Sequence, residues 1–381
     1  MGLCDKTSAS SEISGGDLTS LYINPTRYCN LKCRHCWISP PLKESLDDDE
    51  GELSTEEIIA IIKAAKELGL KDVKFTGGEP LLRKDIGELL RLCHDEDIKV
   101  GIETNGTLID GKMASTIKKY EVTYISVSLD SHLEELNDYF RGRKGAFKRA
   151  SAGIKALVAE GVSPQVIISM YRENFTDITE FIKLMWGLGV NNIKLNTISP
   201  LGRGAELHER GEVPSVREIL EFAEKLESIR RSFRGLLYLD IPVAFKSIEE
   251  VRTGVCGVCN IKNILGILPD GSVSICGIGH IDEKLLFGTV RKDPSKLRHI
   301  WRENALLNRI KKEIPFNLEG VCGICVFRNR CLGGCRAEVY HNTGNLFAPY
   351  WFCQEAYDNG FFPSTRLVPE PLRAGYGNDL L

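Results

Sequence analysis

The cysteines of this sequence are the residues whose number and spacing most clearly indicate chemistry. Of 13 cysteines in 381 residues, Cys29, Cys33 and Cys36 lie together near the start, and eight more lie between Cys256 and Cys353. The N-terminal segment is small and polar and lacks the apolar core of an export signal, and a reducing compartment disfavours structural disulfides. We therefore interpret these eleven clustered cysteines as metal-binding thiolates.

The first group has the spacing Cys29-x3-Cys33-x2-Cys36. Three thiolates in one short loop can bind three irons of a four-iron cluster, and they leave the fourth iron without a protein ligand. An open coordination position is typical of a site that binds a substrate or cofactor, whereas a structural site is closed by four ligands. The alternative is a zinc site in which His35 supplies the fourth ligand.

Strand and helix signals alternate from residue 18 to residue 235. The clearest helical pattern is Ser54–Leu68, in which Ser54 and Glu57 form a capping box. Cys93 ends the apolar pattern Asp85–Cys93 and is predicted to be a small buried hydrophobe. Six runs are predicted as strands: Leu21–Asn24, Val73–Thr76, Val100–Glu103, Tyr124–Leu129, Val166–Ser169 and Ile193–Asn196. This order predicts a parallel sheet with helices outside, either doubly wound or curved into a partial barrel, with ligands at the carboxyl ends of the strands.

Two motifs occupy loops that follow predicted strands. The three-cysteine loop follows the first strand, and Gly77-Gly78-Glu79-Pro80 follows the second. In order and spacing, residues 20 to 200 resemble the radical S-adenosylmethionine (SAM) superfamily. The resemblance implies that SAM chelates the open iron and that an electron from the cluster cleaves SAM to a 5′-deoxyadenosyl radical, which abstracts hydrogen from a substrate. It also implies that the glycine loop holds the methionine amino group of SAM, where Glu79 can accept a hydrogen bond from an ammonium group.

The same resemblance makes other residues near strand ends candidate SAM contacts. His35 precedes the third cysteine, whose backbone lies near adenine in relatives. Asn105 lies in a turn after the third strand that resembles a polar turn near SAM, and the alternative is that this segment is only a turn. Ser128 and Arg141 are candidates for ribose and carboxylate contacts, and the alternative for Arg141 is a surface ion pair.

The C-terminal cysteines form a second pattern. In chain order they are Cys256-x2-Cys259, Gly271-x4-Cys276, Cys322-x2-Cys325-x5-Cys331-x3-Cys335 and Cys353. This spacing resembles the SPASM extension of radical SAM enzymes, which implies two auxiliary 4Fe-4S clusters and, with the first loop, three clusters in all. By this resemblance, one auxiliary cluster is held by Cys256, Cys259, Cys276 and Cys335, and the other by Cys322, Cys325, Cys331 and Cys353.

Composition excludes several classes of protein. The formal net charge of −3 and the pI near 6.2 give no electrostatic case for a nucleic-acid partner or an anionic membrane surface. No apolar run approaches the roughly 20 residues needed to span a bilayer. We predict a cytoplasmic α/β protein: a partial (β/α)6 TIM-like barrel followed by a small cysteine-rich auxiliary-cluster domain. The predicted division is a tail at 1–18, the barrel at 19–235, the auxiliary-cluster domain at 236–365 and a second tail at 366–381.

The combined architecture also suggests a reaction. Most enzymes that resemble it modify peptides or proteins, which implies a maturase that oxidises or cross-links a peptide or protein, with an electron donor such as flavodoxin or ferredoxin. In sulfatase-maturing relatives an Asp follows the cysteine that matches Cys276, but here Gly277 takes that place, which argues against sulfatase maturation. The alternatives are a small-molecule radical SAM oxidase or decarboxylase of the tetrapyrrole (haem) pathway and, more remotely, a zinc-ribbon interaction protein.

Overall fold

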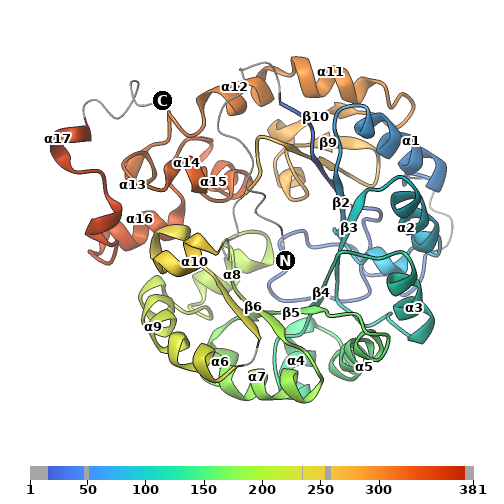
Figure 1. The fold of residues 1–381 in the computed structure, drawn as a ribbon, viewed down its shortest axis with the longest axis horizontal. Coiled ribbons are helices and arrows are strands. Elements are labelled where there is room, and N and C mark those ends of the chain that lie inside the picture. Colours follow the sequence, from blue (N-terminus) through green and yellow to red (C-terminus); the bar gives the residue numbers. More distant parts are fainter. Residues whose placement is uncertain (1–15, 47–50, 234, 254–258, 374–381) are drawn as a thin grey trace.

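Parallel strands alternate with helices along most of the chain (Figure 1). The computed structural model describes residues 16–46, 51–233, 235–253 and 259–373. The parallel strands that continue from one to the next are β1 Ser20–Ile23, β2 Asp72–Phe75, β3 Lys99–Thr104, β4 Tyr124–Ser128, β5 Gln165–Met170, β6 Asn192–Thr197 and β7 Leu236–Asp240. The six predicted strands are all present, and no end differs from the prediction by more than one residue.

Helices cover the outer face of this sheet (Figure 1). They include α1 Thr55–Lys66, α2 Ile86–Asp95, α3 Gly111–Lys119, α4 Glu134–Arg141, α5 Ala146–Ala159, α6 Arg172–Phe175, α7 Ile178–Gly187 and α9 Val216–Ser232. Helix α8 Arg203–Glu209 follows β6 and lies inside this ring of helices (Figure 1). The predicted capping box of Ser54 and Glu57 is present at the start of α1. Alternate strand residues such as Val73 and Phe75 are buried with the apolar faces of the helices in one hydrophobic core, which also contains Cys93 as predicted.

The sheet continues past the predicted boundary at residue 235. Strand β7 pairs in parallel with β6, and β8 Ile264–Ile267 pairs in parallel with β1 at the other side. Two antiparallel strands, β9 Ser272–Ser274 and β10 Leu286–Thr289, follow β8, which gives the order β10-β9-β8-β1-β2-β3-β4-β5-β6-β7. Because β1 and β8 are parallel, their carboxyl ends lie side by side, and the turn after β8 borders the loop after β1.

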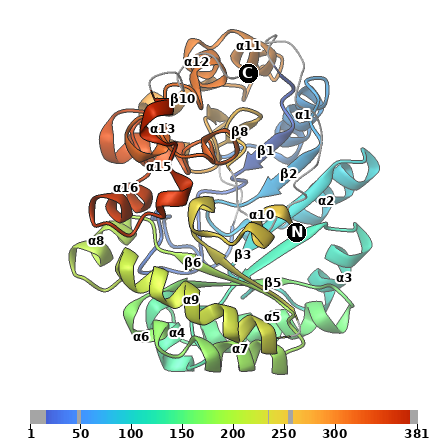
Figure 2. The same cartoon turned by 60° about the vertical axis from the view of Figure 1, so that its left-hand side comes forward.

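Short helices form the rest of the C-terminal part, and Figure 2 shows several of them grouped on one side of the barrel. They are α10 Ile248–Arg252, α11 Lys296–Glu303, α12 Ala305–Glu313, α13 Gly320–Gly323, α14 Arg328–Cys331, α15 Arg336–Thr343, α16 Trp351–Asp358 and α17 Glu370–Arg373. Packing extends into both predicted tails, because Leu18 and Val368 are buried. In the described parts of the chain, no helix is both long and apolar enough to cross a membrane.

Candidate active site

The first thiol loop, defined by Cys29, Cys33 and Cys36, follows β1 at the carboxyl end of the sheet. The three side chains pack into one cluster, in which Cys29 and Cys33 are buried and Cys36 is half-buried. Arg203, at the start of α8, holds the loop by donating its side-chain Nε to the Cys33 carbonyl at 2.7 Å and its backbone N–H to the Cys36 carbonyl at 3.1 Å. The loop is therefore anchored to the region that follows β6.

Nitrogen donors surround the sulfurs of this loop. The Leu31 backbone N–H and Asn105 Nδ2 lie 3.4 Å and 3.8 Å from Cys29 Sγ, and Arg141 Nη1 lies 3.7 Å from Cys33 Sγ. Burial raises the pKa of the Cys29 thiol to about 12, so a thiolate here requires a bound cation as well as these donors. Three sulfurs with N–H donors around them fit an iron–sulfur cluster, whose potential depends on such hydrogen bonds.

The glycine loop, residues 77–80, contacts the first thiol loop through its backbone. A Cβ atom on Gly78 would lie 1.9 Å from the Tyr28 carbonyl oxygen, and the Glu79 N–H donates to the same oxygen at 2.8 Å. Gly77 has a φ of +102°, a conformation that glycine adopts without strain. Pro80 then begins a short 3₁₀ helix. Only glycine permits this close approach of the two loops at positions 77 and 78.

Glu79 holds the glycine loop to the loop after β3. Its carboxylate is 1% exposed and accepts hydrogen bonds from the Leu81 N–H at 3.1 Å, Thr104 Oγ1 at 2.6 Å and the Asn105 N–H at 2.8 Å. Burial raises its pKa to about 7, and the three donors act in the opposite direction. The sequence suggested that this carboxylate receives an ammonium group, but in the structure it is engaged by three donors of the protein.

Asn105 connects the end of β3 to the first thiol loop. Its Nδ2 donates to Asn30 Oδ1 at 2.7 Å, and its Oδ1 accepts from the backbone N–H and the hydroxyl of Thr107 at 2.9 Å and 2.6 Å. The segment is therefore a turn, and it brings Asn105 to the first thiol loop. The predicted contact of Asn105 with SAM stays a prediction. Every polar atom of its side chain is used in positioning these loops.

The remaining predicted SAM contacts come from three places: Arg141 from the end of α4, His35 from the first thiol loop and Ser128 from β4. The side chain of Arg141 is 7% exposed, and its Nε pairs with Asp130 Oδ2 at 2.6 Å. The pair is thus buried, whereas the sequence-based alternative was a surface ion pair. His35 stacks on Phe140 with ring centroids 4.8 Å apart, and burial lowers the pKa of His35 to about 4, so the ring is neutral. Ser128 is the last residue of β4 and is half-buried.

Comparison with known proteins decides the family. The profile of the Radical SAM superfamily matches residues 23–185. An AdoMet-dependent heme synthase of Oleidesulfovibrio alaskensis is 30% identical over 345 residues, which cover 86% of this chain and 85% of that protein. This chain is a radical SAM enzyme. The radical SAM enzyme therefore binds SAM and carries the 4Fe-4S cluster of its family, which excludes the interpretation of the whole chain as a zinc-ribbon interaction protein.

The relatives of this radical SAM enzyme also cover its C-terminal auxiliary domain. Mycofactocin maturase MftC of Mycolicibacterium smegmatis is 27% identical over 91% of this chain and 85% of that protein. Streptococcus suis SuiB bound to S-adenosylmethionine has the same fold, with a TM-score of 0.67, 20% identity and coverage of 89% of this chain and 78% of that chain. These matches extend through both the partial barrel and the cysteine-rich region.

Four thiols of the auxiliary domain line one cavity. This outer thiol set consists of Cys322 in α13, Cys325, Cys331 in α14 and Cys353 in α16. The Cys353 thiol hydrogen-bonds to Cys322 and lowers the pKa of the Cys322 thiol to about 7. Sulfurs close enough to share a proton can also bind a common metal centre, so the four residues fit one of the two predicted auxiliary clusters.

A second group of thiols lies closer to the barrel. This inner thiol set consists of Cys259, Cys276 and Cys335, which pack in one apolar cluster, and the predicted fourth ligand Cys256 lies outside the described residues. Gly277 joins this set to the sheet, because a Cβ atom there would lie 3.2 Å from the Tyr22 side chain. The inner thiol set is therefore next to the inward face of β1.

Sequence reasoning missed a layer of charges inside the barrel. Lys74 on β2 pairs with Glu103 on β3 at 3.0 Å, and Lys194 on β6 pairs with Asp240 on β7 at 2.9 Å. All four side chains are between 24% and 37% exposed, and they lie on the strand face opposite to the hydrophobic core. Lys74 Nζ also lies 4.4 Å from the centre of the Tyr22 ring. The lysines inside two strands, Lys74 in β2 and Lys194 in β6, were the signal that could have found this layer.

Proposed function

We propose that this radical SAM enzyme carries out the oxidative maturation of a peptide or protein, by oxidation or cross-linking of one of its residues. The observation that carries the oxidative part is the position of the inner thiol set, next to Tyr22 on the inward face of the barrel. Removal of a hydrogen atom leaves a substrate radical, and its oxidation requires an electron acceptor nearby. An auxiliary iron–sulfur cluster at this set, with a second at the outer thiol set, would supply one.

When bound, SAM and the first cluster supply a 5′-deoxyadenosyl radical that removes a hydrogen atom from the substrate. The residues of the chain prepare the site for this step. Arg141, the last residue of α4, is held by Asp130 and directs a positive charge toward Cys33. Glu79 and Asn105 fix the two loops that border the first thiol loop, and the neutral His35 ring is held by stacking on Phe140.

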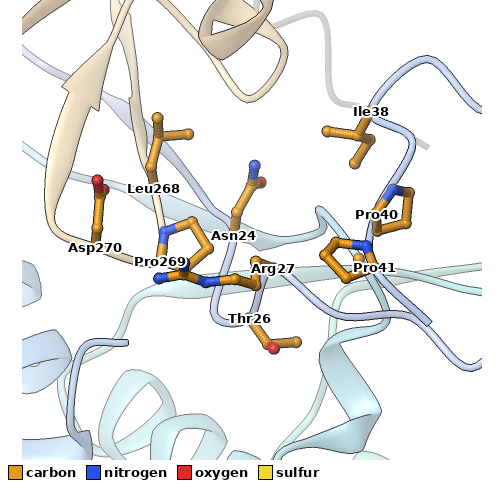
Figure 3. A pocket seen from close by; sticks show the side chains of 10 residues that line it. Asn24, Thr26, Arg27, Ile38, Pro40, Pro41, Leu268, Pro269 and Asp270 are labelled. Carbon is orange, nitrogen blue, oxygen red and sulfur yellow. The ribbon is translucent and has the colours of Figure 1, made fainter. Parts of the chain in front are cut away.

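A pocket beside the glycine loop supports a peptide substrate. It measures about 230 Å³ and is bordered by the loop after β1, residues 38–41 and the turn after β8. Figure 3 shows the side chains that line it, with Arg27 and Asp270 on the same side. Proline rings and both signs of charge suit an extended chain with mixed side chains. The maturase MftC among the relatives supports the same substrate class.

A tetrapyrrole is the second candidate substrate, because other relatives are named as synthases of heme or of Fe-coproporphyrin III. AdoMet-dependent heme synthases are 28–30% identical to this chain, and an Fe-coproporphyrin III synthase of Methanosarcina barkeri is 31% identical over 85% of this chain. In this alternative, the lysines of the charged layer would receive the carboxylates of the porphyrin. Both candidates require substrate oxidation, so the inner thiol set has the same role in each.

One experiment separates the two candidates. The anaerobically purified enzyme, with SAM and a one-electron donor such as flavodoxin or ferredoxin, is incubated with Fe-coproporphyrin III or with short peptides encoded beside its gene. Mass spectrometry of a matured peptide should show the loss of two hydrogen atoms, with one 5′-deoxyadenosine formed per event. Loss of carbon dioxide from the porphyrin, with all peptides unchanged, would replace the peptide proposal by the tetrapyrrole one.

A further inference from the structure

Asn24 is a buried polar residue that none of the interactions described above explains. It follows β1 directly and is 4% exposed. Its Nδ2 donates to the Gly277 carbonyl at 3.2 Å, whereas its Oδ1 has no hydrogen-bond partner among the described residues. Because a carbonyl oxygen can only accept, this bond fixes which end of the amide faces Gly277, and the acceptor end faces away from it. Buried acceptors without a partner are rare in folded proteins and indicate a missing donor.

The unpartnered oxygen lies beside the glycine loop. A Cβ atom on Gly77 would be 3.0 Å from Asn24 Oδ1 and 2.8 Å from Asn24 Cγ, so only glycine leaves room for the amide at this place. Figure 3 shows Asn24 between Leu268–Asp270 on one side and Ile38–Pro41 on the other. The amide therefore borders a pocket that a ligand can enter, next to the loop expected to hold the SAM amino group.

The other side-chain acceptor at this loop is engaged. The Glu79 carboxylate already accepts from Leu81, Thr104 and Asn105. An ammonium group brings three N–H donors and needs acceptors when it leaves water. We propose that Asn24 is a SAM-binding residue whose Oδ1 accepts a hydrogen bond from the methionine ammonium group. The same side chain is tied through Nδ2 to Gly277, directly after Cys276 of the inner thiol set.

The test measures binding in the absence of turnover. The cluster-containing enzyme is kept anaerobic and without a reductant, and equilibrium dialysis gives its affinity for SAM and for 5′-methylthioadenosine, which shares the nucleoside but lacks the ammonium group. Asn24→Ala should weaken SAM binding by about tenfold or more, the effect of one hydrogen bond to a charged group. It should leave the affinity for 5′-methylthioadenosine within about twofold of the wild type, because that ligand makes no such bond.

A second variant covers the case in which the alanine variant fails to fold. Asn24→Asp keeps an acceptor oxygen beside Gly77, so it should retain the preference for SAM over 5′-methylthioadenosine although it loses the donor to Gly277. The matched control is Asn192→Ala. Asn192 begins β6 at the opposite end of the barrel, and its side chain accepts a hydrogen bond from Gln165 at 2.9 Å. Its SAM affinity should equal that of the wild type.

Two results would overturn the proposal. In one, Asn24→Ala binds SAM as tightly as the wild type, which means that Asn24 Oδ1 makes no contact with the ammonium group. In the other, the alanine variant loses affinity for SAM and 5′-methylthioadenosine to the same extent, which assigns Asn24 a purely structural role. Neither result depends on the substrate of the enzyme, so both are independent of the peptide proposal.

Discussion

The cysteines of the first thiol loop and those of the outer thiol set are brought together by different parts of the structure. Cys29, Cys33 and Cys36 come from one loop at the end of a strand, and their sulfurs receive donors from the ends of β3 and α4. The outer thiol set is assembled from α13, α14 and α16, and α13 and α14 have four residues each. Helices of that length are not stable alone. The barrel therefore forms the first site, whereas the cluster proposed for the outer site would hold that site's own elements together.

The largest effect is expected from removing the first thiol loop. Replacing Cys29, Cys33 and Cys36 with alanine should abolish formation of 5′-deoxyadenosine from SAM, because no other described thiol lies in that loop. Iron per chain should fall to about two thirds of the wild-type value if the other two thiol sets each bind a four-iron cluster. Chromatography and iron quantification check the two outcomes. SAM cleavage by the triple variant would show that the assignment of the first site is wrong.

A variant of the outer thiol set is expected to lose stability and to keep SAM cleavage. Cys353→Ser removes one of the four cysteines that line the cavity, so iron should be lost from the C-terminal region. The thermal midpoint should fall by roughly 5 °C, as for a loss of about 2 kcal/mol. SAM cleavage without substrate should persist, because the first thiol loop is intact. Anaerobic calorimetry and limited proteolysis measure the change.

Cys93→Ser is the matched control for that variant. Cys93 is completely buried, as Cys353 nearly is, and both belong to the same hydrophobic core. Cys93 lies in α2, whereas Cys353 lines the cavity of the outer thiol set. It should lose stability without losing iron. Equal iron contents in the Cys93 and Cys353 variants would contradict the assignment of Cys353, and not Cys93, as a metal ligand.

Local patterns predicted the elements but not the contacts between them. The strands, the capping box of α1 and the burial of Cys93 follow from periodicity within one segment, and these expectations are confirmed. The partners of Glu79 and the pair of Lys74 with Glu103 depend on which strands are neighbours, so composition and spacing contain no direct signal for them. The strands β7 to β10 were missed because each is short and most lie in a cysteine- and glycine-rich region that lacks the expected alternation.

Glu79 tests how far the first site depends on its loops. In Glu79→Gln, an amide nitrogen in place of Oε2 would oppose the Asn105 N–H, which costs about 2 kcal/mol for a buried unsatisfied donor. SAM affinity should fall by about tenfold, measured by equilibrium dialysis. Iron proposed for the outer thiol set should be retained, because the described hydrogen bonds of Glu79 are made to Leu81, Thr104 and Asn105 and not to that set. Loss of iron from both regions would show that the first thiol loop and the outer thiol set do not form independently.

The pH dependence of this variant has a defined sign. Burial raises the folded-state pKa of Glu79 to about 7, above its unfolded value of about 4.3, so the folded state binds the proton more tightly. The contribution of Glu79 to the free energy of unfolding of the wild type should therefore decrease as pH rises between those two values. Glutamine does not titrate, so the difference in thermal midpoint between wild type and variant should change across this window and become constant above it.

The smallest effect is expected in the charged layer inside the barrel. Burial alone would raise the pKa of Asp240, but Lys194, Lys246 and the Tyr238 hydroxyl together outweigh burial and hold the pKa below its usual value. The pair therefore stabilises the fold above the unfolded pKa of about 3.9, and this contribution is lost as pH falls through the folded-state value. Lys194→Met should cost about 1 kcal/mol near neutral pH, because both side chains are partly exposed.

The variant also raises the pKa of Asp240, so acid unfolding should begin at a higher pH, which circular dichroism can follow. Lys183→Met is the control, because its pair with Glu180 is more exposed, at 67% and 53%, and should contribute nothing measurable. If the charged layer also receives the substrate, Lys194→Met should lower substrate turnover more than SAM cleavage, and the Lys183 variant should change neither. Equal losses in both activities would mean that Lys194 supports the barrel as a whole, and that the separation between the SAM side and the auxiliary side is weaker than the contacts indicate.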